Sequence, residues 1–95
     1  MTDQTVGRAR VTRFYPNKDK SGGYGFLVVR GYSRGLFFHT ANGRKLNPEG
    51  TDFLEDEQEV VTPLVDQVLV YRLGNGRRGV EAIRWAFAPD GSGLI

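Results

Sequence analysis

The 95-residue sequence contains no cysteine, and His39 is its single histidine. The absence of cysteine excludes a disulfide framework and a thiolate nucleophile. One histidine without any cysteine also leaves too few ligands for the usual zinc sites. We therefore expect no metal or other cofactor and no thiol chemistry.

Long apolar runs are also missing. No stretch approaches the roughly 18 consecutive apolar residues that span a bilayer, and the N-terminal MTDQTVGRAR lacks the apolar run of a secretory signal. A chain of this length has room for one hydrophobic core. We expect a single domain over residues 1–95 that is soluble, cytoplasmic and without membrane contact. Its folded core covers about residues 7–85, and residues 86–95 form a flexible tail.

The two signs of charge are segregated along the chain. Residues 1–45 contain nine basic and two acidic side chains, residues 46–71 contain seven acidic side chains and no lysine or arginine, and residues 72–95 contain four basic and two acidic ones. Ten of the thirteen basic residues are arginine, whose planar guanidinium suits phosphate and base contacts. A charge run can also simply keep a surface solvated, so the pattern alone leaves both interpretations open.

Short β-branched and aromatic runs, separated by Gly, Asn, Asp and Pro, predict an all-β chain. The predicted strands are residues 8–14, 24–29, 35–39, 66–73 and 79–85. Asn75-Gly76 is a hairpin signal before the last strand. Residues 40–62 are polar, acidic and weakly periodic, which predicts a long loop with a short helical turn near 52–58. Five antiparallel strands with a long acidic loop between strands 3 and 4 fit a closed barrel, either the five-stranded OB-fold or an SH3-like barrel.

Side chains alternate between the two faces of a strand, so one face of the second and third predicted strands is core and the other is outer surface. We assign to the interior Val11, Leu27, Val29, Leu36 and Phe38, and to the outer face Tyr24, Phe26, Phe37 and His39. Exposed aromatic rings form an apolar patch that soluble monomers usually avoid unless a ligand binds there. In the alternative interpretation both faces are buried, with Phe53 and Leu54 packed over the rings.

Three segments, in this order, resemble the cold-shock domain family. Gly23-Tyr24-Gly25-Phe26-Leu27 is similar to its first ribonucleoprotein motif, and Leu36-Phe37-Phe38-His39 to its second. Arg77-Arg78-Gly79-Val80-Glu81-Ala82 is similar to its last hairpin, where Arg-Gly is followed by Pro-Gln-Ala. The resemblance covers about residues 7–85. It implies an OB-fold barrel that stacks the bases of single-stranded RNA or DNA, often pyrimidine-rich, on outward aromatic rings.

Carried over residue by residue, the resemblance gives Tyr24, Phe26, Phe37 and His39 as stacking residues and Arg78 as a contact in the last hairpin. The family's Lys-Trp-Phe string on the first strand is Thr12-Arg13-Phe14 here, so a guanidinium replaces one stacking ring. The family's aromatic after the histidine is Thr40. The predicted nucleic-acid-binding residues are Arg13, Phe14, Lys18, Lys20, Tyr24, Phe26, Phe37, His39 and Arg78.

These features predict a protein that binds single-stranded nucleic acid and acts as an RNA chaperone or single-strand protector. We expect it to have no catalytic residues and no small-molecule substrate, and to be a monomer or weak homodimer. One alternative is a small barrel that binds other proteins through its aromatic face. A second is an enzyme that uses the carboxylates of residues 49–59 to bind Mg²⁺. A further hypothesis is that the acidic segment mimics nucleic acid and competes for the basic surface.

Overall fold

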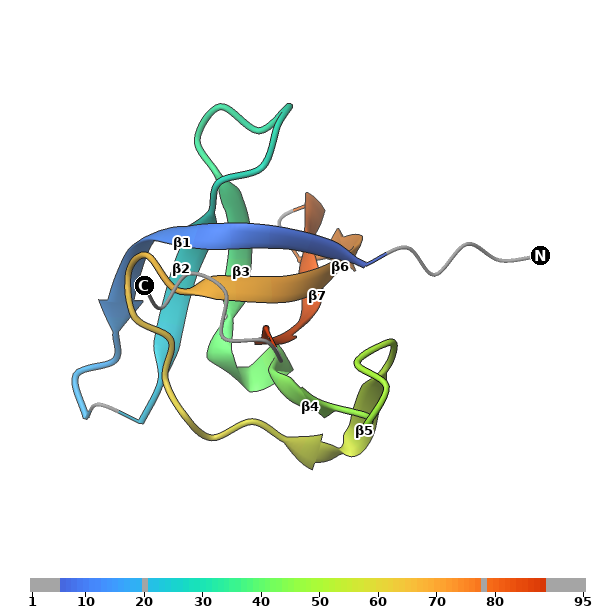
Figure 1. Ribbon diagram of the computed structural model, residues 1–95. Coiled ribbons are helices and arrows are strands. Elements are labelled where there is room, and N and C mark those ends of the chain that lie inside the picture. The colour runs from blue at the N-terminus through green and yellow to red at the C-terminus, as the bar shows by residue number, and fades with distance from the viewer. Residues whose placement is uncertain (1–5, 20, 78, 89–95) are drawn as a thin grey trace.

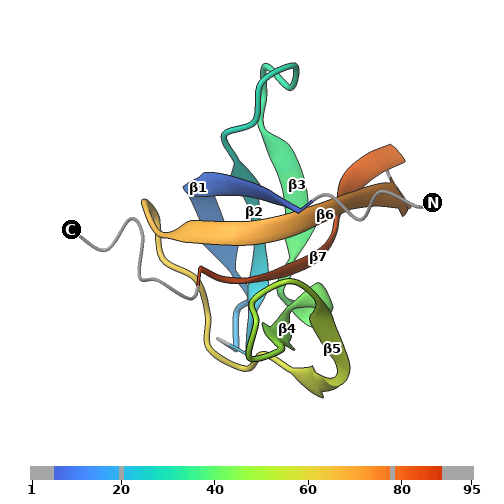
Figure 2. The ribbon, with the colours of Figure 1, turned by 45° about the vertical axis from the view of Figure 1, so that its right-hand side comes forward.

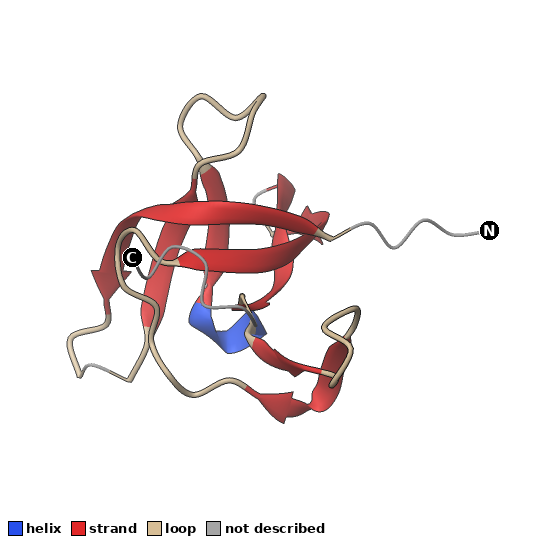
Figure 3. Cartoon of the chain, in the orientation of Figure 1, coloured by secondary structure: helices blue, strands red, loops and turns tan. Residues whose placement is uncertain are grey.

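The computed structural model describes residues 6–19, 21–77 and 79–88. Five strands close into a barrel in the order β1-β2-β3-β7-β6, and two further strands, β4 and β5, form a separate sheet (Figure 1). The 3₁₀ turn η1 follows β3 directly (Figure 3). The elements are β1 (Gly7–Pro16), β2 (Gly23–Leu27), β3 (Leu36–His39), η1 (Thr40–Asn42), β4 (Arg44–Leu46), β5 (Phe53–Gln58), β6 (Val68–Gly76) and β7 (Gly79–Phe87). The prediction of an all-β, five-stranded barrel is confirmed.

The barrel is mixed, so the prediction of a purely antiparallel barrel is wrong. The pairs β1–β2, β1–β6, β2–β3 and β6–β7 are antiparallel, whereas β3 and β7 run parallel, with Phe38 opposite Ala82. A parallel pair needs a long crossover, which here consists of η1, the β4–β5 hairpin and β6. Strand direction across such a connection cannot be obtained from local alternation.

The segment predicted as a long acidic loop with a helical turn near 52–58 is instead built around an antiparallel hairpin, β4–β5. The Asn47 side-chain oxygen accepts a hydrogen bond from the Thr51 N–H at 2.9 Å and closes the turn. Phe53 is 4% exposed and packs with Val70 and Ala86. This anchor holds the hairpin against β6 and β7, at the opposite end of the barrel from the 28–35 connection (Figure 2).

The barrel interior agrees with the face assignment for the strand residues. Val11, Leu27, Leu36 and Phe38 are fully buried. Val29 lies beyond the end of β2 and is half-buried against the core.

The last hairpin differs from its prediction in where the chain reverses. Asn75 and Gly76 remain in β6 and pair with Val80 and Gly79, so the reversal comes after Gly76. The following strand, β7, contributes the fully buried Trp85, whose indole N–H donates to the His39 carbonyl oxygen at 2.9 Å. The prediction of a flexible tail over residues 86–95 is wrong at its start, because Ala86 and Phe87 belong to β7 and Ala86 is 1% exposed. Residues 89–95 lie outside the described residues.

Candidate functional site

Four aromatic side chains from three adjacent strands lie together on the outer surface of the barrel. The register places Tyr15 opposite Tyr24 and Phe26 opposite Phe37. The ring centroids are 5.2 Å apart for Tyr15–Tyr24, 5.7 Å for Tyr24–Phe37 and 5.9 Å for Phe26–Phe37. We call Tyr15, Tyr24, Phe26 and Phe37 the aromatic face. Tyr15 and Tyr24 are exposed and the two phenylalanines are half-buried.

A β-bulge in β1 determines which side chains of this strand reach the aromatic face. Val11 pairs with Leu27 and Arg13 pairs with Phe26, so Thr12 is an extra residue on β1. An extra residue shifts the alternation of a strand by one position. Val11 is therefore interior, while Arg13 and Tyr15 reach the outer surface, although the spacing of these three residues alone would place them on one face.

Arg13 extends the aromatic face by one planar group. Its guanidinium carbon lies 4.4 Å from the centre of the Phe26 ring, and one of its terminal nitrogens donates to the Arg34 carbonyl oxygen at 2.8 Å. These two contacts hold the cation over the ring. The arrangement provides a positive charge and a flat surface at the same place.

His39 follows the aromatic face at the end of β3, opposite Tyr24 on β2. Its ring nitrogen Nδ1 accepts a hydrogen bond from the Ala41 N–H at 3.0 Å and so caps η1. Since Nδ1 is occupied, Nε2 is the ring nitrogen that can contact a ligand.

Two grooves flank the aromatic face. One, of about 650 Å³, is lined by Phe37, His39, Arg77 and Glu81, among others, and we call it the hairpin groove because it borders the β6–β7 hairpin. The other, of about 580 Å³, includes Arg13 in its lining and lies on the β1–β2 side. Phe37 of the aromatic face also lines the hairpin groove, and Arg13, which lies over the Phe26 ring, lines the second groove. The two grooves and the rings therefore form one surface across β1, β2, β3 and β7.

The remaining predicted site residues do not all lie on this surface. Phe14 is half-buried and stacks on Phe38 with ring centroids 6.3 Å apart, so it faces the core. Lys18 is exposed in the β1–β2 connection. Lys20 and Arg78 lie outside the described residues. Tyr15, which the sequence analysis missed, occupies the outward position next to Phe14; the bulge that places it there has no clear sequence signal.

The β4–β5 hairpin contacts a different part of the barrel. Phe53 packs on the outer side of β6 and β7, with Val70 and Ala86, and not over the aromatic rings. The exposed fraction of Tyr24 is 37% and that of Tyr15 is 41%. The alternative in which Phe53 covers the aromatic rings is therefore wrong.

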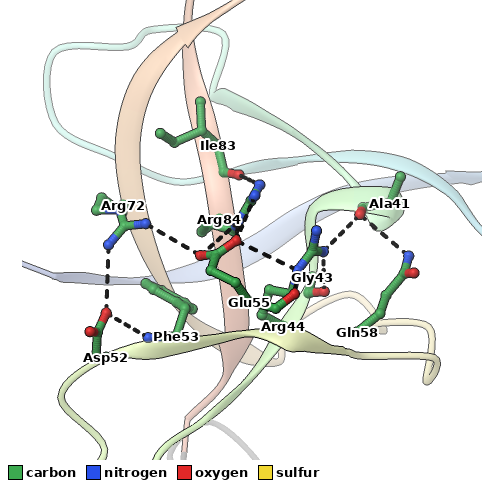
Figure 4. Close-up of polar contacts among 10 residues, drawn as sticks. All are labelled: Ala41, Gly43, Arg44, Asp52, Phe53, Glu55, Gln58, Arg72, Ile83 and Arg84. Atoms are coloured by element: carbon green, nitrogen blue, oxygen red, sulfur yellow. Dashed lines mark hydrogen bonds and ion pairs between the residues drawn. The ribbon is translucent and has the colours of Figure 1, made fainter.

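The β4–β5 hairpin also contacts the barrel through a cluster of ion pairs around Glu55 (Figure 4). A Glu55 carboxylate oxygen lies 2.7 Å from Arg84, and the carboxylate is 3.7 Å from Arg72 and 3.9 Å from Arg44. Asp52 adds a second contact to Arg72 at 3.7 Å. The hydrogen bond from Arg84, supported by the positive charges of all three arginines, lowers the pKa of Glu55, and desolvation opposes the shift.

This cluster shows where two carboxylates of the acidic segment act. Glu55 and Asp52 contact arginines of β4, β6 and β7. Arg13 on the aromatic face instead contacts the Phe26 ring and the Arg34 carbonyl oxygen. Carboxylates of the β4–β5 hairpin therefore neutralise the positive charges of Arg44, Arg72 and Arg84.

Over residues 6–19, 21–77 and 79–88, no three histidine or carboxylate side chains gather in an arrangement that could hold a metal ion. Within the same ranges no helix has the length and apolar character needed to cross a membrane. No protein-family model, curated protein or solved structure matches this chain.

Proposed function

We propose that the protein binds single-stranded RNA or DNA on the aromatic face and the two adjoining grooves, as a binding module without catalysis of its own. The observation that carries the proposal is the set of four contiguous rings extended by Arg13, with both tyrosines exposed. Base stacking on aromatic side chains contributes about 1–3 kcal/mol per base and tolerates any sequence.

The charges near the rings support the same proposal. Arg13 lies on the aromatic face, and Arg34 and Arg77 line the grooves. Phosphates that follow a line of bases across the rings would meet these guanidinium groups, and the affinity would then fall as salt rises. Duplex bases are already stacked and paired, so the same surface favours single strands.

The fold supports assigning the barrel to the OB-fold and the cold-shock type. A closed five-stranded barrel with its candidate ligand surface on β2 and β3 agrees with the way OB-folds bind oligonucleotides. Binding by stacking, with little reading of base edges, would allow the protein to hold melted RNA strands apart as a chaperone.

The test is a fluorescence anisotropy titration of the full chain with labelled oligo-U and oligo-dT, comparing Tyr24→Ala with Tyr24→Phe. Removing the exposed ring should weaken binding about tenfold, which corresponds to about 1.4 kcal/mol for one stacked base. Tyr24→Phe keeps the ring and should stay within about twofold of the wild type. Equal affinities of the Ala and Phe variants would contradict stacking at this position.

A protein-interaction module is the second candidate, and one observation favours it. Residues 60–65 contain four exposed apolar side chains: Val60, Val61, Leu64 and Val65. An exposed apolar group of this kind is typical of a protein contact. This candidate predicts no measurable binding of any oligonucleotide at low salt.

A further inference from the structure

Glu81 is a buried acidic residue in the hairpin groove. It is 6% exposed, and it lies on the groove side of β7, where it lines the same groove as Phe37 and His39. A side-chain carbon placed on Gly76 would collide with the Glu81 carboxylate. The glycine therefore provides the space in which Glu81 lies flat over the backbone of β6.

The Glu81 carboxylate has no ion pair or hydrogen bond to any residue in the described part of the chain. The nearby Arg84, which lines the same groove, uses its guanidinium on Glu55 and on the Ile83 carbonyl oxygen. Among the described residues, no fully buried side-chain oxygen lacks a partner. It follows that the Glu81 oxygens are accessible from the hairpin groove. A largely buried carboxylate is costly without a hydrogen-bond donor, so a ligand that donates to Glu81 from the groove would be stabilised there.

The rest of the groove is suited to a nucleobase. Phe37 of the aromatic face lines it, together with Asn42 and Asn75. Its volume of about 650 Å³ lies in the range of about 300–1,000 Å³ typical of small-ligand sites. Arg77 in its lining offsets the charge of Glu81 toward a phosphate backbone.

We infer that the hairpin groove reads one base of the bound strand and that Glu81 selects a base with an exocyclic amino group, guanine above all. This inference rests on the proposed function. A carboxylate only accepts hydrogen bonds. Guanine presents its N1–H and its 2-amino group side by side, which matches two carboxylate oxygens. Thymine and uracil present one N–H between two carbonyl oxygens, which the carboxylate repels.

The first experiment changes the strand and leaves the protein intact. Anisotropy titrations at low salt compare dT8 with the same strand carrying one central guanine, and then with inosine in place of that guanine. The guanine strand should bind about tenfold more tightly than dT8. Inosine lacks the 2-amino group, so it should lose about fivefold relative to guanine.

The second experiment changes Glu81 alone. Glu81→Gln keeps the shape but adds a donor, so the preference for the guanine strand over dT8 should fall to about threefold or less. Glu57→Gln removes the same charge from an exposed position on β5 and should leave the preference unchanged. Thermal unfolding curves of both variants report whether they are folded.

The outcomes separate the two proposals. Equal binding of the guanine, inosine and dT8 strands by the wild type would overturn the inference and leave the proposed function standing. A preference that is the same in the wild type and in folded Glu81→Gln would overturn it as well. Failure of the wild type to bind any strand would overturn the proposed function, and the inference with it.

Discussion

Phe53 anchors the β4–β5 hairpin to the barrel. Replacing it tests whether this hairpin stabilises the fold without taking part in the proposed ligand surface. Phe53 is the buried residue of this hairpin, at 4% exposure, and it packs on Val70 and Ala86. Replacement of a buried phenylalanine by alanine costs about 3–5 kcal/mol. The Arg72 guanidinium carbon also lies 5.2 Å from the ring centre, a contact that Phe53→Ala removes.

We expect Phe53→Ala to lower the free energy of unfolding by about 3 kcal/mol, at the lower end of that range because the hairpin lies at the barrel surface and can relax. Urea unfolding followed by the fluorescence of the buried Trp85 measures the change. The midpoint should fall while the slope with denaturant stays constant. Leu64→Ala, at an exposed position, serves as the control and should stay within about 0.5 kcal/mol of the wild type.

If the proposed function holds, the folded Phe53→Ala variant should bind single strands with the affinity of the wild type, because the aromatic face belongs to β1, β2 and β3 whereas Phe53 contacts β6 and β7. A stability loss below about 1 kcal/mol would refute the role of Phe53 as an anchor. A large loss of affinity in the folded variant would refute the separation of the hairpin from the ligand surface.

Two further predictions concern the contacts that hold β7 in place. Since the pKa of Glu55 is lowered in the folded state, its contribution to stability is present above the ordinary value of 4.5 and is lost as the pH falls through the folded-state pKa. Between pH 7 and pH 3 the free energy of unfolding, measured in urea, should therefore fall less for Glu55→Gln than for the wild type. Equal decreases would contradict the ion-pair cluster. Trp85→Phe removes the donor to the His39 carbonyl oxygen and leaves a cavity in the core, so the free energy of unfolding should fall by about 2 kcal/mol. Because this variant lacks the single tryptophan, its urea unfolding is followed by circular dichroism. A change below about 0.5 kcal/mol would show that the hydrogen bond and the packing contribute little.

The parts of the fold that could be predicted from the sequence are those that depend on local alternation. The burial of Val11, Leu27, Leu36 and Phe38 follows from period-two patterning in short strands. The outward position of Tyr24 follows from the same pattern.

The β4–β5 hairpin was missed because β5 has one buried residue, Phe53, followed by Leu54 and a run of exposed polar side chains. Such a strand shows no alternation, and its stability comes from contacts with β6 and β7, which are distant in the sequence. The parallel pairing of β3 and β7 depends in the same way on the path of the whole chain.

The candidate site was predictable only in part for a similar reason. The bulge at Thr12 decides that Tyr15 reaches the aromatic face and that Phe14 faces the core, and Thr12 itself carries no bulge signal. The burial of Glu81 depends on the space over Gly76, a residue on the opposite strand of the hairpin.

The most direct test of the central proposal is a comparison of labelled oligo-dT with a duplex of equal length, each titrated with the wild-type protein at two salt concentrations. The account predicts tighter binding of the single strand and an affinity that falls as salt rises. Equal affinity for the duplex, or no binding of the single strand at low salt, would contradict it.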